Sequence, residues 1–376
     1  MYFKEVTDTL ASAGNLRTFP EDGFADKGID FSSNDYLGFG KLTFRDVAAD
    51  HPELMDARMS SCASRLLAST QKEYSNLEQL LESLYGFNRR ALIFNSGYHA
   101  NTGMINALAA IPDSVIFADK LVHASIIDGM NGVKNRFRFA HNDLGYLERL
   151  INNYGEKFRH KIIVVESVYS MDGDTPDLET LIEIKKKYPG VILYVDEAHA
   201  FGVSGPSGLG LTMGTSAPYE FDIVVGTFGK ALGSYGAFAV MKPELRDFFI
   251  NKARSLIFST SLPPQTALWS RIMIERMVKA EDSRRHLREL SELLHESLCR
   301  IDPGTSRVPG HIAYVVTGDP HRAVELSRKL KDGGITVLPI RTPTVPPGTD
   351  RLRISLSAAH SAEDVKTLIS ALERWL

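Results

Sequence analysis

Two polar segments, each following a short apolar run, bring together a carboxylate, an imidazole and an amine. One run leads into Asp196-Glu-Ala-His199, and the next leads into Thr227-Phe-Gly-Lys230. A lysine after a buried strand, among glycines, could form a Schiff base with a flat carbonyl cofactor if its pKa were lowered. An aspartate at a strand end would keep a pyridine nitrogen protonated, so that the ring could act as an electron sink. His199 could reach the phenolic oxygen of the same ring, and Thr227 its phosphate. These residues predict a pyridoxal phosphate site with Lys230 as the cofactor lysine.

Three other strand ends carry residues that suit the same cofactor. Gly97 and Tyr98 open a helix after an apolar run, and a glycine at a helix N-terminus leaves backbone N–H groups free for a phosphate. His123 could lie flat against a ring face, and Ser170 could supply a hydroxyl. Each would be an ordinary loop residue by itself. The prediction depends on five strand ends agreeing.

Other chemistries lack a partner motif in this sequence. Asp-Glu-Ala-His also matches a helicase Walker B box, but the required Gly-x-x-x-x-Gly-Lys-Ser/Thr segment does not occur. There is no Gly-x-Ser-x-Gly elbow of an α/β-hydrolase, and the glycines of residues 205–210 are in the wrong order for dinucleotide binding. Neither Cys-x-x-Cys nor His-Glu-x-x-His occurs, so no zinc site is predicted.

The elements that must position these residues lie between about Ser60 and Thr260. There, short β-branched runs alternate with amphipathic stretches, and this alternation is typical of a largely parallel sheet with helical connections. Ligands of such sheets bind beyond the carboxyl ends of the strands. The expected strands are Ala91–Phe94, Val115–Phe117, Ile162–Glu166, Val191–Val195, Ile223–Val225 and Phe238–Val240. The expected helices between them include Tyr74–Tyr85, Thr102–Ala110 and Leu178–Lys187.

From about Pro263 the pattern changes to a smaller α+β domain. Long helices are expected at Gln265–Val278, Ser283–Leu298 and Ala362–Leu376, with short strands at Ile312–Val316, Ile335–Leu338 and Leu352–Ser355. We therefore predict an N-terminal segment (1–45) that packs with the small domain, a large cofactor-binding domain (46–262) and a small C-terminal domain (263–376).

Bulk properties are those of a soluble enzyme. The 376 residues carry 43 basic and 46 acidic side chains, a net charge of −3 that argues against a nucleic-acid partner. Only two cysteines occur, Cys62 and Cys299, which suits a reducing compartment. No apolar run is long enough to span a bilayer, and residues 1–10 lack the pattern of a secretion signal. The expected location is the cytoplasm.

Several motifs together make the chain resemble the α-oxoamine synthases, which are fold-type-I pyridoxal-phosphate enzymes. The resemblance extends from about Asp30 to His360. Its motifs are Phe31-Ser-Ser-Asn34-Asp35-Tyr36-Leu37-Gly38, Ser64-Arg65-Leu-Leu67, Asn95-Ser-Gly97-Tyr98-His-Ala-Asn101, Ser170-Met-Asp172-Gly173-Asp174, Asp196-Glu-Ala-His199 and Thr227-Phe-Gly-Lys230-Ala-Leu-Gly233. The segments Ser32–Gly38 and Pro343–Arg353 are most similar to the biotin-pathway member, which condenses L-alanine with a pimeloyl thioester.

The resemblance implies a role for individual residues. It makes Lys230, His123, Asp196 and His199 catalytic, with His123 stacked on the ring. The implied cofactor contacts are Lys230, Gly97, Tyr98, His123, Ser170, Asp196, His199 and Thr227, and the implied substrate contacts are Arg17, Asn34, Arg341 and Thr344.

The resemblance also implies partners and leaves alternatives open. It implies a homodimer with shared active sites, acting on an amino acid and an acyl thioester carried by coenzyme A or by an acyl carrier protein. A relative that uses glycine or serine, or a long-chain acyl group, is the main alternative. A binding protein that kept the fold without turnover is a more distant one.

Three positions depart from the family pattern. Ser60–Ala63 replaces a glycine-rich stretch, Tyr74 stands where many members have histidine, and Leu209 occupies a place often taken by arginine. The first two are expected near where a partner subunit's active site would be lined, so they bear on acyl specificity.

Overall fold

The computed structural model describes residues 2–19, 28–69, 71–86, 88–301, 306–307 and 310–375. It divides into two compact units. The smaller unit comprises Met1–Leu37, Ser170–Asp174 and Asp282–Leu376, and the larger comprises Gly38–Tyr169 and Thr175–Glu281.

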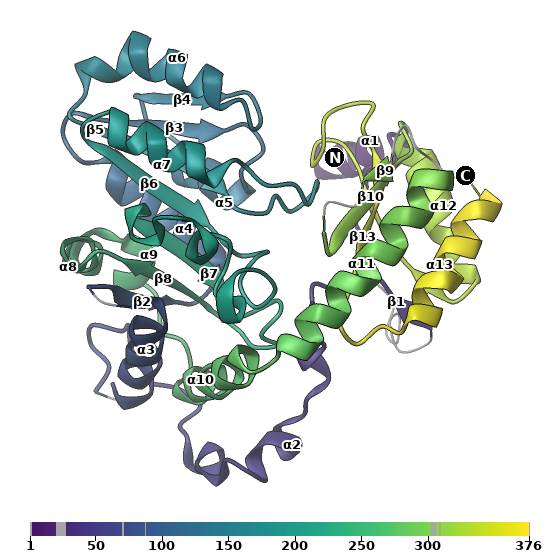
Figure 1. Ribbon diagram of the computed structural model, residues 1–376, viewed down its shortest axis with the longest axis horizontal. Helices are drawn as coiled ribbons and strands as arrows, with labels where there is room; N and C mark the ends of the chain where they lie inside the picture. Colours follow the sequence, from purple (N-terminus) through teal and green to yellow (C-terminus); the bar gives the residue numbers. More distant parts are fainter. Residues whose placement is uncertain are drawn as a thin grey trace. The chain divides into compact units, whose positions relative to one another are not determined.

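The larger unit is built on a seven-stranded sheet (Figure 1). In spatial order its strands are β2 (Arg90–Phe94), β8 (Ala237–Met241), β7 (Ile223–Thr227), β6 (Val191–Asp196), β5 (His160–Glu166), β3 (Ser114–Asp119) and β4 (Arg136–Phe139). All neighbouring pairs are parallel except those of β8, which runs antiparallel to both β2 and β7. The carboxyl ends of the other six strands therefore meet at one edge.

Helices cover both faces of this sheet. The α-helices of the larger unit are α2 (Phe44–Ala48), α3 (Lys72–Tyr85), α4 (Gly97–Ala109), α5 (Ala124–Gly129), α6 (Leu144–Tyr154), α7 (Leu178–Lys187), α8 (Pro243–Lys252), α9 (Arg254–Ile257) and α10 (Pro264–Val278). Its short 3₁₀ helices are η1 (Phe39–Lys41), η2 (Pro52–Asp56), η3 (Gly155–Lys157), η4 (Pro206–Gly208), η5 (Thr212–Gly214) and η6 (Pro218–Glu220).

The core of the larger unit lies where α4, α5, α8 and α9 pack on one face of the sheet. Met104 and Leu108 of α4 are fully buried there, with Ile126 of α5 and Phe249 of α8. The strands beneath them are apolar on both faces, as expected for a parallel sheet covered by helices on each side. This rigid layer holds the strand ends in place.

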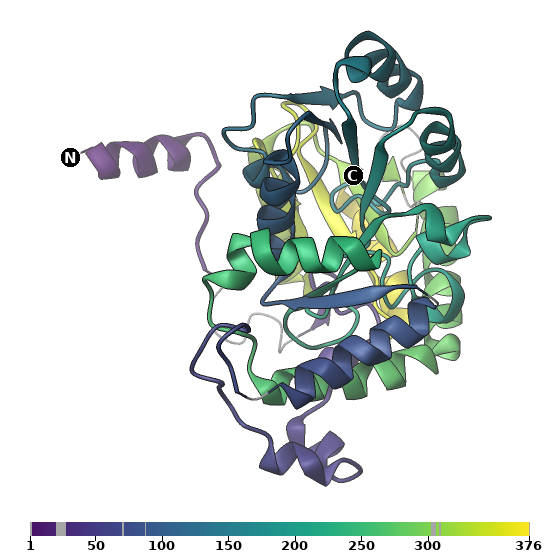
Figure 2. The same cartoon turned by 90° about the vertical axis from the view of Figure 1, so that its left-hand side faces the viewer.

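The smaller unit contains a four-stranded sheet and a separate parallel strand pair. Its elements are α1 (Tyr2–Ser12), β1 (Ile29–Asp30), α11 (Glu281–Ile301), β9 (Ser306–Arg307), β10 (Ile312–Val316), α12 (Pro320–Asp332), β11 (Ile335–Thr336), β12 (Leu338–Ile340), β13 (Arg351–Ser355) and α13 (Ala362–Trp375). The sheet order is β12-β13-β10-β9, all antiparallel, and β1 pairs with β11. The helix α1 buries none of its side chains, and Figure 2 shows it extending away from the strands of this unit.

All six strands expected in the sheet of the larger unit are confirmed, and the structure adds β4. The predicted strand Ile335–Leu338 is wrong as a single element: β11 ends at Thr336 and pairs with β1, whereas β12 begins at Leu338 and pairs with β13. The helix predicted from Thr102 begins at Gly97, because the Ser96 side chain caps it.

The unit boundary falls later in the chain than the domain boundary predicted from the sequence. Helix α10 packs on α3 and therefore belongs to the larger unit. Ser170–Asp174 joins the smaller unit, where Arg351 donates to Asp172 over 2.7 Å. The three-part domain assignment (1–45, 46–262 and 263–376) itself stays a prediction. No helix in the described part of the chain has the length and apolar character needed to cross a membrane.

Candidate active site

A cavity of about 150 Å³ opens in the larger unit, beyond the carboxyl ends of its strands. It is lined by Gly97, Tyr98, Asn101, His123, Glu166, Asp196, Ala198, His199, Thr227 and Lys230. The seven residues of this unit that the sequence assigned to the cofactor are all among them. Strand ends that are far apart in the sequence thus converge on one site, as expected for an open α/β sheet.

Lys230 and His199 form a close pair in this cavity. The lysine Nζ lies 2.7 Å from Nε2 of His199, which is only 4% exposed. Lys230 follows β7, and a hydrogen bond of 3.0 Å from Gly233 N to the Lys230 carbonyl closes the turn that carries it. The amine is therefore held at a defined place, next to a group that can exchange a proton with it.

Asp196, the last residue of β6, presents its carboxylate to the cavity and is 5% exposed. One oxygen accepts a 2.9 Å hydrogen bond from Ala198 N, and the other accepts a 2.7 Å hydrogen bond from Asn101 Nδ2. Two donors stabilise the ionised form of a carboxylate that would otherwise lose its hydration on burial. The site therefore offers a fixed negative charge.

His123 follows β3 and caps the N-terminus of α5. Its Nδ1 accepts from Ser125 N over 3.2 Å and lies 2.8 Å from Ser125 Oγ, while its own backbone N–H donates to the carboxylate of Glu166. Burial lowers the pKa of the His123 imidazole, an effect that the nearby negative charge of Asp196 opposes and the positive charge of Lys230 reinforces. The ring is therefore held neutral and oriented.

The N-terminus of α4 offers a place for an anion. The side chain of Ser96 accepts from His99 N over 3.2 Å and caps the helix, and the next N–H groups of a first turn have no acceptor within the helix. A Cβ added at Gly97 would meet nothing within 4 Å, so the space beside these groups is open. The Thr227 hydroxyl is held nearby by donating to Gly236 O over 3.0 Å. These groups suit a phosphate.

The cavity thus combines an amine, a stabilised carboxylate, an imidazole and an anion-binding helix end. A protonated pyridine ring that carries an aldehyde and a phosphate matches each of these groups in charge and hydrogen bonding. The donor set therefore fits pyridoxal phosphate.

Comparisons with known proteins identify the family of the chain. The family model "Aminotransferase class I and II" matches residues 26–372. Proteins named 8-amino-7-oxononanoate synthase are 41% identical in Chlorobaculum parvum (97% of this chain and 96% of that protein) and 40% identical in Haemophilus ducreyi (99% and 100%). The solved serine palmitoyltransferase of Sphingomonas wittichii has a TM-score of 0.87 at 30% identity, covering 99% of this chain and 96% of that one. The 8-amino-7-oxononanoate synthase of Francisella tularensis has a TM-score of 0.76 at 26% identity, covering 93% and 98%.

The chain belongs to the α-oxoamine synthase family. It has the fold-type-I architecture of pyridoxal-phosphate enzymes, its cofactor is pyridoxal 5′-phosphate, and it is an acyltransferase of the 8-amino-7-oxononanoate synthase type.

The other site residues predicted for this α-oxoamine synthase lie in the smaller unit. Arg17 donates to the Thr344 hydroxyl over 2.9 Å, and Arg341 donates to the carbonyl of Gly14. Burial lowers the pKa of Arg341, and the positive charge of Arg17 lowers it further, which indicates that the two guanidinium groups face a common region. Three of the four predicted substrate residues therefore form one cluster.

The remaining two residues have different surroundings within the smaller unit. Asn34 accepts from Arg353 over 3.2 Å and from the hydroxyl of Tyr36 over 3.0 Å. The backbone carbonyl of Ser170 accepts from Arg353 Nε over 2.6 Å. Arg353 therefore joins the segment that carries Asn34 to the segment that carries Ser170.

Three cavity residues, Asn101, Glu166 and Ala198, received no role from the sequence, and the first two have polar side chains. Asn101 lies one turn into α4, on the side that faces Asp196, and Glu166 ends β5 beside the strand that carries Asp196. Asn101 stands within the Gly97 motif, four residues after the glycine, so helical periodicity could have placed it on the same face. The sequence indicated less clearly that Glu166 lines the site, because it marked this residue only as the last residue of a strand.

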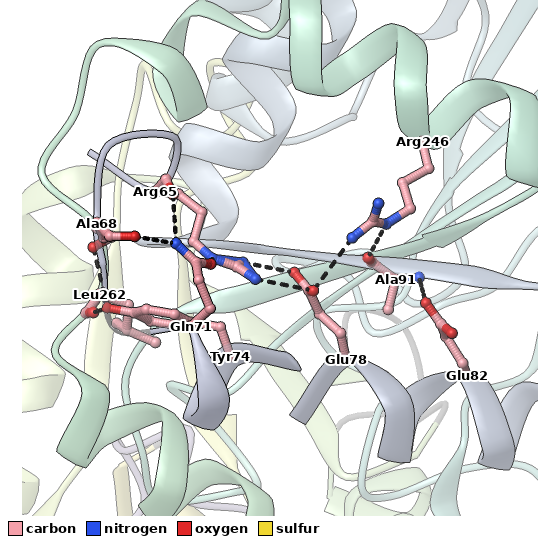
Figure 3. Close-up of polar contacts among 10 residues, drawn as sticks. Arg65, Ala68, Gln71, Tyr74, Glu78, Glu82, Ala91, Arg246 and Leu262 are labelled. Carbon is pink, nitrogen blue, oxygen red and sulfur yellow. Dashed lines mark hydrogen bonds and ion pairs between the residues drawn. The ribbon is translucent and has the colours of Figure 1, made fainter. Parts of the chain in front are cut away.

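Tyr74, one of the departures from the family pattern, is buried beneath a charged cluster (Figure 3). Its hydroxyl donates to Leu262 O over 2.5 Å, and the guanidinium of Arg65 lies 4.5 Å from its ring centre. Arg65 makes two hydrogen bonds to Glu78, at 3.0 and 3.2 Å, and Arg246 approaches the same carboxylate at 3.4 Å. Burial raises the pKa of Glu78 and the two arginines counteract that effect.

The other departure near Tyr74 joins the same contacts. The hydroxyls of Ser61 and Ser261 lie 2.5 Å apart, and Tyr74 lies 3.1 Å from Ser261. Asn95, which directly precedes the capping residue of α4, donates to Thr260 O over 2.6 Å. The residues at these departures therefore form a packed connection between the segment at residues 60–63 and the loop at residues 259–262.

Proposed function

We propose that this α-oxoamine synthase condenses L-alanine with a pimeloyl thioester to give 8-amino-7-oxononanoate, carbon dioxide and a free thiol, as a step of biotin biosynthesis. The observation that carries the proposal is the cavity in which Lys230, His199 and Asp196 meet. The choice of substrates is supported by the Chlorobaculum parvum and Haemophilus ducreyi proteins named 8-amino-7-oxononanoate synthase, which are 41% and 40% identical to this chain.

The proposed roles follow from what each side chain can bind. Lys230 holds the cofactor covalently, the Asp196 carboxylate pairs with the pyridine nitrogen, and His199 binds the phenolic oxygen. When bound, pyridoxal phosphate supplies an electron sink for negative charge at the α-carbon of the amino acid. Gly97 and Tyr98 offer backbone N–H groups to the phosphate. Thr227 and Ser170 are proposed as hydroxyl contacts.

Lys230 is also the proposed proton carrier. Its amine removes the α-proton of L-alanine, and the adjacent imidazole of His199 keeps it oriented over a 2.7 Å contact. A new carbon–carbon bond then forms at the acyl carbonyl, the carbon–sulfur bond breaks, and the thiolate leaves and takes up a proton from solvent. Loss of carbon dioxide leaves a carbanion that takes up a proton again, for which Lys230 is the proposed donor. His123, held neutral, is proposed to stack on the ring and to position the acyl carbonyl.

The cluster of Arg17, Arg341 and Thr344 is the proposed site for the distal carboxylate of the pimeloyl chain. The positive charge of Arg17 lowers the pKa of Arg341, and an anion that bound both guanidinium groups would offset this repulsion. A long-chain fatty acyl group has no such carboxylate, so this cluster favours a dicarboxylic acyl donor. Asn34 is proposed to contact the amino-acid substrate.

We also propose that the chain works as a homodimer with active sites shared across the interface. Support comes from large apolar side chains of the larger unit that are strongly exposed. They include Met55 (69%), Met59 (67%), Leu67 (80%) and Phe258 (71%). Leu67 and Phe258 flank the bridge between Ser64 and Thr260, so they lie in the same region. Single exposed apolar residues are common, but neighbouring side chains of this size and exposure are typical of an interface.

Thiol release tests the reaction directly. The protein loaded with pyridoxal phosphate would receive L-alanine, glycine or L-serine, each with pimeloyl-CoA, pimeloyl carrier protein or palmitoyl-CoA. Thiol release with L-alanine and a pimeloyl donor alone is the expected result, and the two pimeloyl donors distinguish coenzyme A from carrier protein. Release with serine and palmitoyl-CoA would instead assign the second candidate, which the TM-score of 0.87 to serine palmitoyltransferase favours. A protein that binds the cofactor and turns over no pair would be a binding protein.

A further inference from the structure

A network of buried hydrogen bonds joins Asp196 to His123, two residues that the mechanism uses separately. It runs from Asp196 through Asn101 to Ser125 and then to His123, and Tyr194 binds Asn101 from the side. Tyr194, Asn101 and Ser125 are 0%, 1% and 0% exposed. Such complete burial means that water cannot replace a missing partner, so each hydrogen must be directed by its neighbours.

The direction of each hydrogen follows from the chemistry of Asn101. Its carbonyl oxygen accepts from the hydroxyl of Tyr194 over 2.6 Å. Its amide nitrogen donates one hydrogen to Asp196 over 2.7 Å and the other to Ser125 Oγ over 2.9 Å. Both amide hydrogens are therefore used, and the opposite amide orientation would direct the NH₂ group at the tyrosine and the carbonyl oxygen at a carboxylate. Burial raises the pKa of Tyr194 well above its ordinary value, so the tyrosine keeps its hydrogen to donate.

The same logic fixes the proton on the imidazole. Because Ser125 Oγ already accepts from Asn101, its own hydrogen is free to donate to His123 Nδ1, which lies 2.8 Å away. The backbone N–H of Ser125 points at the same nitrogen over 3.2 Å. A ring nitrogen that receives two donors cannot carry a proton, so the ring hydrogen lies on Nε2.

We propose that Asn101 is a positioning residue that sets the state of two groups at once: it stabilises Asp196 as a carboxylate, and through Ser125 it holds His123 as the neutral tautomer protonated at Nε2. His123 can then act as a hydrogen-bond donor from a known ring nitrogen. The consequence for turnover rests on the proposed function, whereas the tautomer does not. The charged groups around the His123 side chain are Asp128, Asp196 and Lys230, and its backbone N–H binds Glu166.

Nuclear magnetic resonance on protein with ¹⁵N-labelled histidine measures the tautomer and the protonation midpoint of His123. The chain has 11 histidines, and the His123 signals are identified by their loss in His123→Gln. The wild type, with and without pyridoxal phosphate, should show Nδ1 unprotonated and Nε2 protonated, with a midpoint below the ordinary 6.5. A wild-type ring that carries its hydrogen on Nδ1 would overturn the proposal.

Two variants test the route through the serine. Asn101→Asp keeps the shape of the side chain but replaces the amide donor with an acceptor. The hydroxyl of Ser125 would then rotate away from His123 to donate to the new carboxylate. The protonation midpoint of His123 should rise by about one pH unit or more, which is about a tenfold increase in proton affinity. Ser125→Ala removes the hydroxyl without adding charge and should raise the midpoint by a smaller amount, because the backbone donor remains. Ser114→Ala, which removes a buried hydroxyl that binds Ala109 O over 3.3 Å, should leave it unchanged.

The outcomes separate the possible explanations. A rise in both Asn101→Asp and Ser125→Ala supports the proposal. A rise in Asn101→Asp alone would assign the effect to the added charge and overturn the hydrogen-bonded route. Absence of thiol release by the wild type would defeat the proposed function and leave the tautomer result intact.

Discussion

The amine of Lys230 lies 2.7 Å from Nε2 of His199, so the side chain proposed to move the proton is in direct contact with a second group that can share it. These residues come from the turns that follow β7 and β6, two neighbouring parallel strands. Their contact is a consequence of strand order, because parallel neighbours present their carboxyl ends at the same edge.

Lys230→Ala should abolish covalent binding of pyridoxal phosphate and reduce thiol release by about a thousandfold or more, since it removes the proposed attachment point and the proposed proton carrier. The visible absorption spectrum after addition of cofactor measures the first effect and the thiol assay the second. The matched control is Lys252→Ala at the exposed end of α8, which should behave like the wild type. Turnover by Lys230→Ala at the wild-type rate would disprove the assignment.

Asp196→Asn should lower kcat/KM by at least about a hundredfold, because a neutral amide of the same shape cannot hold a pyridine nitrogen protonated. The absorption spectrum of the bound cofactor should change with it. Asp247→Asn, at an exposed position of α8, is the control. A spectrum and rate equal to those of the wild type would show that another group supplies the charge.

The lowered pKa of His123 predicts that acid destabilises the folded chain. Between the folded pKa and about 6.5 the unfolded chain binds more protons, so the free energy of unfolding should rise with pH across that window and fall as the pH drops. His123→Gln should reduce this slope. Urea unfolding of the cofactor-free protein at several pH values between 5 and 7.5 measures it, and His160→Gln is the control. An unchanged slope would mean that His123 titrates as it does in the unfolded chain.

Glu78→Gln should lower the free energy of unfolding by about 3 kcal/mol, because it leaves Arg65 and Arg246 without their buried carboxylate. Tyr74→Phe should cost about 1 kcal/mol through the lost hydrogen bond to Leu262. Glu73→Gln, on the same helix, should change stability by less than about 0.5 kcal/mol. Equal effects of the two glutamate substitutions in urea unfolding would contradict a special role for the cluster.

Arg17→Met and Arg341→Met should raise KM for the pimeloyl donor by about tenfold or more, with a smaller change in kcat, because each removes a charged hydrogen bond to a carboxylate far from the reacting carbon. Steady-state thiol release measures both constants. Arg322→Met, at an exposed position of α12, should leave them unchanged. A loss of kcat at unchanged KM would place these arginines elsewhere in the reaction.

The sequence by itself determined the α/β class and most of the strand-end residues at the cavity, with Glu166 as the exception. Buried parallel strands need continuous apolar runs, and the polar residue that ends each run is visible in one dimension. Gly97, His123, Asp196 and Lys230 could be assigned in this way, and the motifs around them identified the family. The strand β4 was missed because its sequence Arg-Phe-Arg-Phe alternates, and two of its four side chains are exposed.

Only the tertiary structure decided how these residues act on one another. The donor from Asn101 to Asp196 joins residues 95 positions apart, and the contacts of Arg65 and Arg246 with Glu78 join segments that share no local pattern. The meeting of Arg17 with Thr344 is of the same kind. Hydrogen-bond direction, tautomer and burial depend on which side chains the packed core brings within about 3 Å, and this information is absent from the order of residues along a strand or helix.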